Sequence, residues 1–296
     1  MLDSITPLIL TYNEAPNIGR TLEQLRWASE IVMVDSFSDD ETVEIASGFS
    51  QVRVFQRKFD NHGNQWNFGL NETGISTKWV MSLDADFMLT PECVDELKSL
   101  QPASDTNGYL ALFTYCINGR LLRSGLLPPV TVLYRRGFAR YEQDGHTQRL
   151  ILDGKIETLR SPILHDDRKP LGRWFQSQQR YMALEAQKIV AADAQTLGLA
   201  DRVRRLRVIA PLAVLLYCLI VRGGVLDGWP GFYYAFQRML AELLLSLYLI
   251  EYDLKGTDQP KLVATESQSH GEAIGQKPEG LASESAPSIL AGGSAR

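Results

Sequence analysis

The stretch Trp79-Val80-Met81-Ser82-Leu83-Asp84-Ala85-Asp86 joins an apolar, strand-forming run to two carboxylates. In extended backbone, side chains two positions apart point to the same side, so Asp84 and Asp86 would share one space beyond the strand. Ligands bind at that edge in open α/β sheets. Adjacent carboxylates repel unless a cation or a shared proton neutralises them, and a hard divalent cation prefers oxygen ligands. The stretch therefore predicts a metal site, with a solvated acidic turn before a helix at Thr90-Pro91 as the alternative.

Short apolar runs alternate with helical patterns in the amino-terminal part of the chain. The runs that we interpret as strands are residues 5–10, 31–34, 52–55 and 79–83. Pro16 and Asp39-Asp40 stand where helices would begin, and Gly48 stands where one would end. Strand–helix alternation with short connections predicts a parallel sheet that is covered on both faces.

The alternation breaks down after Asp86. We expect strands at residues 109–117, 130–134, 150–152 and 156–159, with glycine- and proline-containing loops between them. Antiparallel additions to the first sheet would fit this order. The sequence therefore predicts an α/β fold with a mixed, mostly parallel sheet and helices on both faces, in a first domain of residues 1–170.

Composition excludes several classes of protein. The chain has 296 residues, 45% of them hydrophobic, which is enough for one catalytic domain with an extension or for two small domains. Its formal net charge of −5 argues against a nucleic-acid binder. Cys93, Cys116 and Cys218 are too far apart for a disulfide framework or a metal cluster and indicate a reducing compartment. The amino terminus lacks the features of an export signal, so we expect the catalytic part in the cytoplasm.

The carboxyl-terminal part changes to helical patterns, with an extension expected at residues 171–254. A basic cluster of Arg202, Arg204, Arg205 and Arg207 precedes the uncharged residues 208–221, and a turn leads to a largely apolar helix at 232–249. Such a hairpin suits the membrane interface, with the arginines attracting anionic lipid. We therefore expect peripheral association with the inner face of the membrane. A true span and a soluble helical pair are the alternatives, and residues 255–296 are expected to be disordered.

Four motifs, taken in their order and spacing, carry a family resemblance. They are Leu10-Thr11-Tyr12-Asn13-Glu14, Val34-Asp35-Ser36-Phe37-Ser38-Asp39-Asp40-Glu41-Thr42, Gln65-Trp66-Asn67 and Asp84-Ala85-Asp86. Together they resemble the inverting family 2 glycosyltransferases of the GT-A fold, over residues 1–170. The Asp-Ser-Phe-Ser sequence and the later Leu226-Asp227-Gly228-Trp229 turn resemble the branch with lipopolysaccharide-core glucosyltransferases.

The resemblance implies a nucleotide-sugar donor, usually linked to UDP, and inverting transfer to a hydroxyl of a glycan or glycolipid. It also implies Mn²⁺ or Mg²⁺ on the donor diphosphate, where the cation stabilises the leaving group. Asp86 matches the metal-binding aspartate, with Asp84 beside it or toward the ribose. The positions implied to hold the donor are Leu10, Tyr12, Glu14, Asp35, Gln65, Asn67 and Asp84. Two departures weaken the match, since many members have a second aspartate at Ser36 and an arginine at Trp66.

The general base is the largest gap in the resemblance. The family often places a His-Glu pair after the antiparallel strands, but here Thr147 follows His146. Asp144, beside a glycine in an expected loop, is our first candidate to take the acceptor's proton. His146 is the second candidate and Glu142 the third.

His165 stands where members of the branch have a histidine near the diphosphate. Its imidazole suits Mn²⁺ better than Mg²⁺, so we include it among the metal ligands. Arg168 and Lys169, in the same run, are candidates to offset phosphate charge.

Three other functions fit part of the sequence. A haloacid-dehalogenase-type phosphotransferase needs its aspartate pair after the first strand, whereas this pair follows the fourth. A membrane-bound scaffold would keep the sheet without turnover. Transfer to a polyprenyl phosphate would also suit a membrane-proximal hairpin.

Overall fold

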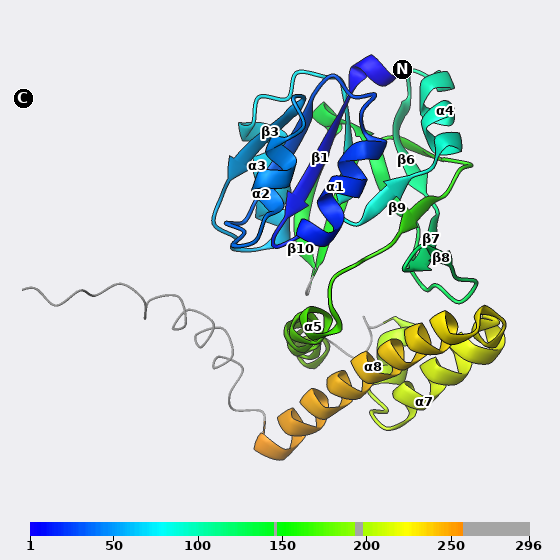
Figure 1. Ribbon diagram of the computed structural model, residues 1–296. Helices are drawn as coiled ribbons and strands as arrows, with labels where there is room; N and C mark the ends of the chain where they lie inside the picture. The colour runs from blue at the N-terminus through cyan, green and yellow to red at the C-terminus, as the bar shows by residue number, and fades with distance from the viewer. Residues whose placement is uncertain (145–146, 193–197, 257–296) are drawn as a thin grey trace, which may run out of the picture. The chain divides into compact units, whose positions relative to one another are not determined.

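Figure 1 shows the computed structural model of the chain, which describes residues 1–144, 147–192 and 198–256. The chain divides after Leu254, and residues Met1–Leu254 form a compact first unit. The predicted boundary after residue 170 falls inside the first unit. The predicted disordered tail lies outside the described residues from 257 onward.

A seven-stranded sheet in the order β12-β6-β9-β4-β1-β2-β3 forms the centre of the first unit. Its strands are β1 (Ile5–Thr11), β2 (Ile31–Asp35), β3 (Val52–Gln56), β4 (Trp79–Asp84), β6 (Thr106–Ala111), β9 (Val130–Arg135) and β12 (Lys155–Thr158). Only β9 runs against its neighbours in this sheet. The predicted mixed, mostly parallel sheet is therefore confirmed. Each of the first four strands ends one residue later than predicted.

Helices cover both faces of this sheet, because alternate residues of each central strand point to opposite sides (Figure 1). Ile5 and Ile9 of β1 pack with α1 (Ala15–Gln24), α2 (Thr42–Ser47) and α4 (Pro91–Ser99). Leu8 points the other way, toward Trp66 of α3 (His62–Glu72). The side chains of Asn61 and Thr90 cap α3 and α4 by accepting hydrogen bonds from backbone N–H groups.

Two smaller sheets come from the part of the chain where the sequence was least regular. One has the order β5-β13-β7-β8 and the other is the hairpin β10-β11. Their strands are β5 (Phe87–Leu89), β7 (Phe113–Ile117), β8 (Arg120–Leu121), β10 (Ala139–Asp144), β11 (Thr147–Leu152) and β13 (Ile163–His165).

Two predictions for this part are wrong. A single strand over residues 109–117 is interrupted at Leu112, because the chain passes there from the main sheet into the smaller one. The expected loop around Asp144 is instead the end of β10. Buried Tyr141 anchors that strand by stacking on Trp66 of α3 with ring centroids 5.4 Å apart.

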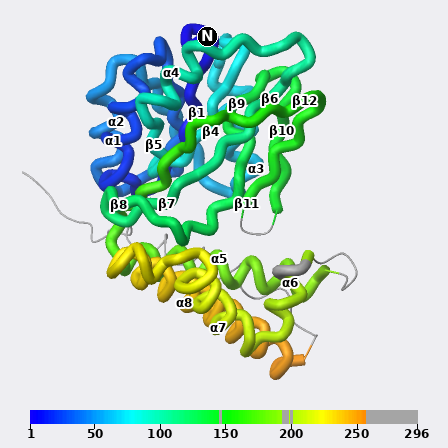
Figure 2. Tube along the Cα trace, turned by 90° about the vertical axis from the view of Figure 1, so that its right-hand side faces the viewer, coloured from blue at the N-terminus to red at the C-terminus, as the bar shows by residue number. Residues whose placement is uncertain are grey.

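The carboxyl-terminal part of the first unit is helical. It consists of α5 (Leu171–Ala191), α6 (Leu199–Arg204), α7 (Ile209–Leu216), a π-helical turn (Tyr217–Val221), a 3₁₀ turn (Gly224–Asp227) and α8 (Trp229–Lys255). Helices α5 and α8 lie close to each other (Figure 2), and their apolar side chains, including Ile189 and Leu245, pack together. Among the described residues, no helix has the length and apolar character needed to cross a bilayer.

Three arginines of the predicted basic cluster contact neighbouring helices of the same unit. Arg204 forms ion pairs with Glu242, at 2.9 Å, and with Glu185 and Asp201. Arg205 donates hydrogen bonds to backbone carbonyls at the end of α5, and Arg207 pairs with a carboxylate of α8. These three arginines therefore hold the helices together. Glu185 and Glu242 are buried, so their charges need Arg204 as a partner, and the attraction of the cluster to anionic lipid stays a prediction.

Replacement of Gly63 by alanine should destabilise the protein by about 1–3 kcal/mol. A Cβ atom at Gly63, the second residue of α3, would lie 2.9 Å from the backbone nitrogen of Gln143 in β10. Gly172 is the second residue of α5 and has open space at the same position. Gly172→Ala is thus a matched control that should leave the free energy of unfolding unchanged or raise it by up to about 1 kcal/mol. Denaturant unfolding of both variants checks this, and equal stabilities would refute the close contact of α3 with β10.

Candidate functional site

Two tight turns at the carboxyl edge of the main sheet shape the site. Asn13 follows β1 and Phe37 follows β2, and both have positive φ angles of 56° and 60°. The Asn13 side chain donates to Asp39, at 2.5 Å, and accepts from the backbone N–H of the same residue, at 2.9 Å. These bonds hold the two turns together and stabilise a backbone conformation that non-glycine residues rarely adopt. Tyr12 is displayed just before the first turn and is exposed.

The aspartate pair lies at the same edge, as the sequence predicted. Asp84 ends β4, beside Leu10 in the neighbouring strand, and Asp86 follows in the turn before β5. β13 pairs with β5, so that its last residue, His165, reaches the buried Asp86. The distance from His165 Nε2 to Asp86 Oδ2 is 3.4 Å.

The charges in this site are strongly coupled. Displacement of water by the surrounding protein, and then the charge of Asp86, raise the pKa of Asp84 to about 6, although the residue is exposed. Burial opposes ionisation of Asp86, but nearby His165 and Lys169 outweigh it and lower its pKa to about 2. Burial likewise opposes protonation of His165, and the Asp86 carboxylate outweighs it and raises the histidine pKa. The surroundings of Asp86 therefore stabilise a positive charge placed next to its carboxylate.

A second group of charges closes the site from the segment after β13. Lys169 Nζ lies 2.6 Å from Glu14 Oε1 and 3.7 Å from Asp167 Oδ2. Burial raises the pKa of Glu14 to about 7 against the opposing effect of Lys169. Asn17 of α1 donates to both carboxylates, at 2.8 and 2.9 Å, and accepts from the backbone N–H of Arg168. Asn17 was not predicted as a site residue, because a single asparagine inside a helical pattern does not indicate a binding role.

The two predicted phosphate-compensating residues differ in their surroundings. Arg168 forms an ion pair with Asp166, with 2.7 Å between Nη2 and Oδ2, and this pairing offsets its charge. Lys169 is largely buried, and its ammonium contributes to the field around Asp86. Of the two, Lys169 is the residue that contributes positive charge within the site.

Three of the residues implied to hold the donor already have protein partners. Asp35 is buried and accepts hydrogen bonds from Thr11 and from the side chain and backbone of Ser38. Gln65 donates to Ser36, at 3.1 Å, and accepts from Arg57. Asn67 makes a pair of hydrogen bonds, each 2.9 Å, with the backbone of Tyr141 in β10. These contacts show how the residues support the edge, and their direct contact with a donor stays a prediction.

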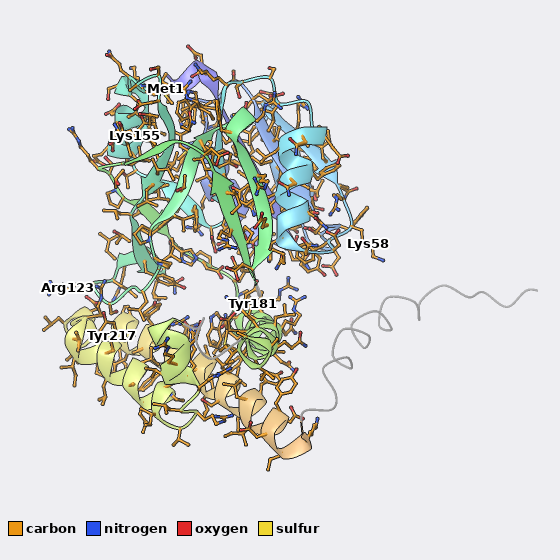
Figure 3. The ribbon with its side chains drawn as sticks, turned by 180° about the vertical axis from the view of Figure 1, so that it is seen from behind. Met1, Lys58, Arg123, Lys155, Tyr181 and Tyr217 are labelled. Carbon is orange, nitrogen blue, oxygen red and sulfur yellow. The ribbon has the colours of Figure 1, made fainter. Side chains whose placement is uncertain are left out.

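Helix α5 contacts the site at Tyr12. The Arg173 guanidinium lies 5.8 Å from the centre of the Tyr12 ring. Burial raises the pKa of Tyr181. The nearby charge of Lys169 opposes this rise, and those of Asp84 and Glu14 add to it. Figure 3 shows Tyr181 on the part of α5 that faces the sheet. Neither Arg173 nor Tyr181 was identified from the sequence, because the helical pattern alone does not show which face covers the site.

Two of the three candidate bases, Glu142 and Asp144, lie on β10. Asp144, at the end of β10, pairs with Lys188 of α5, with 3.0 Å between Oδ1 and Nζ. Glu142 is exposed and pairs with Arg140, at 3.1 Å, and Arg149, at 3.8 Å. His146 lies outside the described residues. The structure thus places Asp144 next to a cation of α5, and the choice between the three residues stays a prediction.

The residues around Asp86 fit a divalent cation in part. Asp86 Oδ1 and His165 Nδ1 are buried and have no hydrogen-bond partner among the described residues. A carboxylate and an imidazole are suitable ligands for Mn²⁺. No group of three or more His, Cys, Asp or Glu side chains in the described ranges is arranged to hold a metal ion. The protein would therefore supply part of a coordination shell, and donor phosphates and water would complete it.

Sequence comparison identifies relatives with a similar first domain. Residues 8–150 match the sequence model described as "Glycosyl transferase family 2". An uncharacterized glycosyltransferase of Rickettsia bellii is 32% identical over 108 residues, which are 36% of this chain and 36% of the relative. The chain thus spans just over a third of that relative's length. The lipopolysaccharide core biosynthesis glycosyltransferase LpsC of Rhizobium meliloti is 25% identical over 63% of this chain and 72% of that protein.

Solved structures with a similar arrangement are more distant. S. aureus TarS 1-349 in complex with UDP-GlcNAc has 15% sequence identity and a TM-score of 0.43, over 85% of this chain and 92% of that one. Glucosyl-3-phosphoglycerate synthase from Mycobacterium tuberculosis, in complex with Mn²⁺, UDP and phosphoglyceric acid, has 17% identity and a TM-score of 0.43. That similarity covers 65% of this chain and 80% of the synthase. From the matched sequence model and the glycosyltransferase relatives, residues 8–150 are a domain of glycosyl transferase family 2.

Proposed function

We propose that this protein is an inverting hexosyltransferase that uses a UDP-linked sugar and a divalent cation. The acceptor is a hydroxyl group of a glycan or glycolipid in lipopolysaccharide or other cell-envelope synthesis. The family 2 domain and the relation to LpsC support this assignment. The observation that carries it is the buried Asp86–His165 pair beside Asp84, at the edge of the sheet where ligands bind.

The arrangement of charge suits a diphosphate leaving group. Asp86 and His165 would hold the cation, with Asp84 beside them, and the cation when bound would offset the negative charge that develops on the diphosphate. Lys169 adds a positive charge to the same region, and Glu14 and Asp167 hold its ammonium in place. Tyr12 would stack on the base beneath Arg173. With the diphosphate and the base in these positions, the sugar of the donor would lie between the aspartate pair and the β10–β11 hairpin.

The acceptor's proton requires a group on the side away from the diphosphate, because inversion needs attack in line with the departing bond. Asp144 is our candidate for this base. Its carboxylate lies beside Lys188, which keeps a compensating charge near it when it ionises. Transfer of the acceptor's proton to Asp144 would accompany bond formation between the acceptor oxygen and the sugar.

Asp86→Ala should lower sugar transfer from a UDP-hexose at least about a hundredfold, because metal stabilisation of a leaving group supplies several kcal/mol. A donor screen with UDP-, GDP- and dTDP-sugars, with membranes as the acceptor source, identifies the substrate for the assay. Chelation of divalent ions should reduce wild-type activity to a similar level. Asp95→Ala, an exposed change on α4, is the control and should retain full activity. Failure of the wild type to bind or turn over any nucleotide sugar would refute the proposed function, and full turnover without metal would refute the role of the cation.

Asp144→Asn should lower kcat by about 10²–10⁴-fold and leave the dissociation constant of the donor unchanged, because it removes the base and not the donor site. Glu142→Gln should have little effect. Lys188→Met separates the two roles of Asp144, since it removes the ion pair and keeps the carboxylate. Steady-state kinetics with a donor-binding measurement check this. Equal losses in the Asp144 and Lys188 variants would show that the ion pair matters and that the base is elsewhere, with His146→Ala as the next variant.

A further inference from the structure

The segment that begins with α7 has an uncovered apolar face. We call the "α7 face" the exposed side chains of Ile209, Leu212, Leu216, Tyr217, Ile220 and Val221. Their spacing of three, four and one residues places them on one side of the helix and of the π-helical turn. The opposite side is also apolar, and its Ala210 and Cys218 are buried against the protein. A helix that is apolar on all sides is normally covered on all sides.

The turn after α7 displays two more large apolar residues. Asp227 points inward, where its carboxylate accepts hydrogen bonds from the backbone N–H groups of Arg123 and Ser124. Leu226 and Trp229, on either side, are 72% and 84% exposed. The buried acid therefore fixes a turn whose exposed positions are a leucine and a tryptophan. Figure 3 shows Tyr217 and Arg123 at this end of the helical part.

The exposed charged side chains near the α7 face are positive. Residues 208–250 contain four charged side chains, namely Arg222, Asp227, Arg238 and Glu242. Both acids are buried, with 5% and 7% of their side chains exposed, and both lie against arginines. Arg222 is exposed, as is Arg123 in the loop to which the turn is bound. The surface beside the apolar face is therefore positive.

We propose that the α7 face, with Leu226 and Trp229, lies in the interface of a membrane that contains anionic lipid. Apolar side chains on one side of a helix, a tryptophan and flanking arginines together match the boundary between headgroups and acyl chains. A helix lying in the membrane plane needs no spanning length. A symmetric dimer through the same face would place two exposed Arg222 side chains in one interface, whereas both carboxylates of residues 208–250 are buried within their own copy. The inference does not depend on which sugar is transferred.

The test uses the full chain and vesicles of phosphatidylcholine mixed with phosphatidylglycerol. The wild type should co-sediment with these vesicles, and more strongly than with pure phosphatidylcholine. Leu212→Asp combined with Ile220→Asp should lower the partition coefficient at least about tenfold, because both side chains would leave the apolar layer. Phe59→Asp combined with Phe138→Asp is the matched control, since it places the same two charges at exposed aromatic positions outside the α7 face. It should bind like the wild type.

Three results would overturn the proposal. They are the absence of vesicle binding by the wild type, equal binding to the two vesicle types, and unchanged binding of the double variant. Thermal melts should show that the double variant remains folded. A second measure of insertion, which does not depend on these variants, is the quenching of Trp229 fluorescence by brominated lipid. The variant Trp229→Phe shows how much of the quenched signal comes from Trp229. Multi-angle light scattering without vesicles decides about the dimer. A wild-type dimer that the double variant converts to a monomer would assign the face to a second copy and overturn the lipid assignment.

Discussion

The pairing of β13 with β5 is the contact on which the candidate site depends. Each strand has three residues, and their antiparallel register places His165 opposite Phe87, next to Asp86. The backbone N–H of Asp166 donates to the carbonyl of Asp86 at 3.1 Å and extends the contact by one residue. Without this pairing the aspartate turn would have no histidine, and the segment that carries Lys169 would not cross the edge of the sheet.

Hydrogen bonds to α1 then hold the crossing segment in place. Asn17 binds Glu14 and Asp167 through its amide nitrogen and Arg168 through its oxygen. Arg20 donates to both the side chain and the carbonyl of Asp166. Such a network is stabilising only while each buried partner is present, since an unpaired buried charge costs several kcal/mol. The same bonds therefore fix the fold and the position of the charges that face Asp86.

The sequence was most informative where local pattern and tertiary structure agree. Four parallel strands read as apolar runs, of which β1, β2 and β4 are largely buried and β3 is half-buried, and Asp84 and Asp86 come at the end of the last one. Strands β5 and β13 are too short for a periodic signal, and β10 is polar because one of its faces is exposed. The partners of the arginine cluster were also hidden, because Glu185 and Glu242 come from separate helices. Local sequence shows that a residue is charged, whereas its partner depends on how distant segments pack.

An aromatic stack connects the candidate site with the helical part. Tyr115 of β7 lies 4.4 Å from the ring centre of His165 and 4.7 Å from that of Tyr234 in α8. Tyr234 is buried in the same cluster as Cys218, on the inner side of the π-helical turn. Its hydroxyl accepts a hydrogen bond of 2.9 Å from the backbone N–H of Leu126, in the loop that also binds Asp227. Aromatic rings in such contact resist independent movement, since interiors pack as densely as organic crystals. The apolar helices are therefore part of the support of His165, so that anything bound to the α7 face would be held in a fixed orientation relative to the aspartate pair.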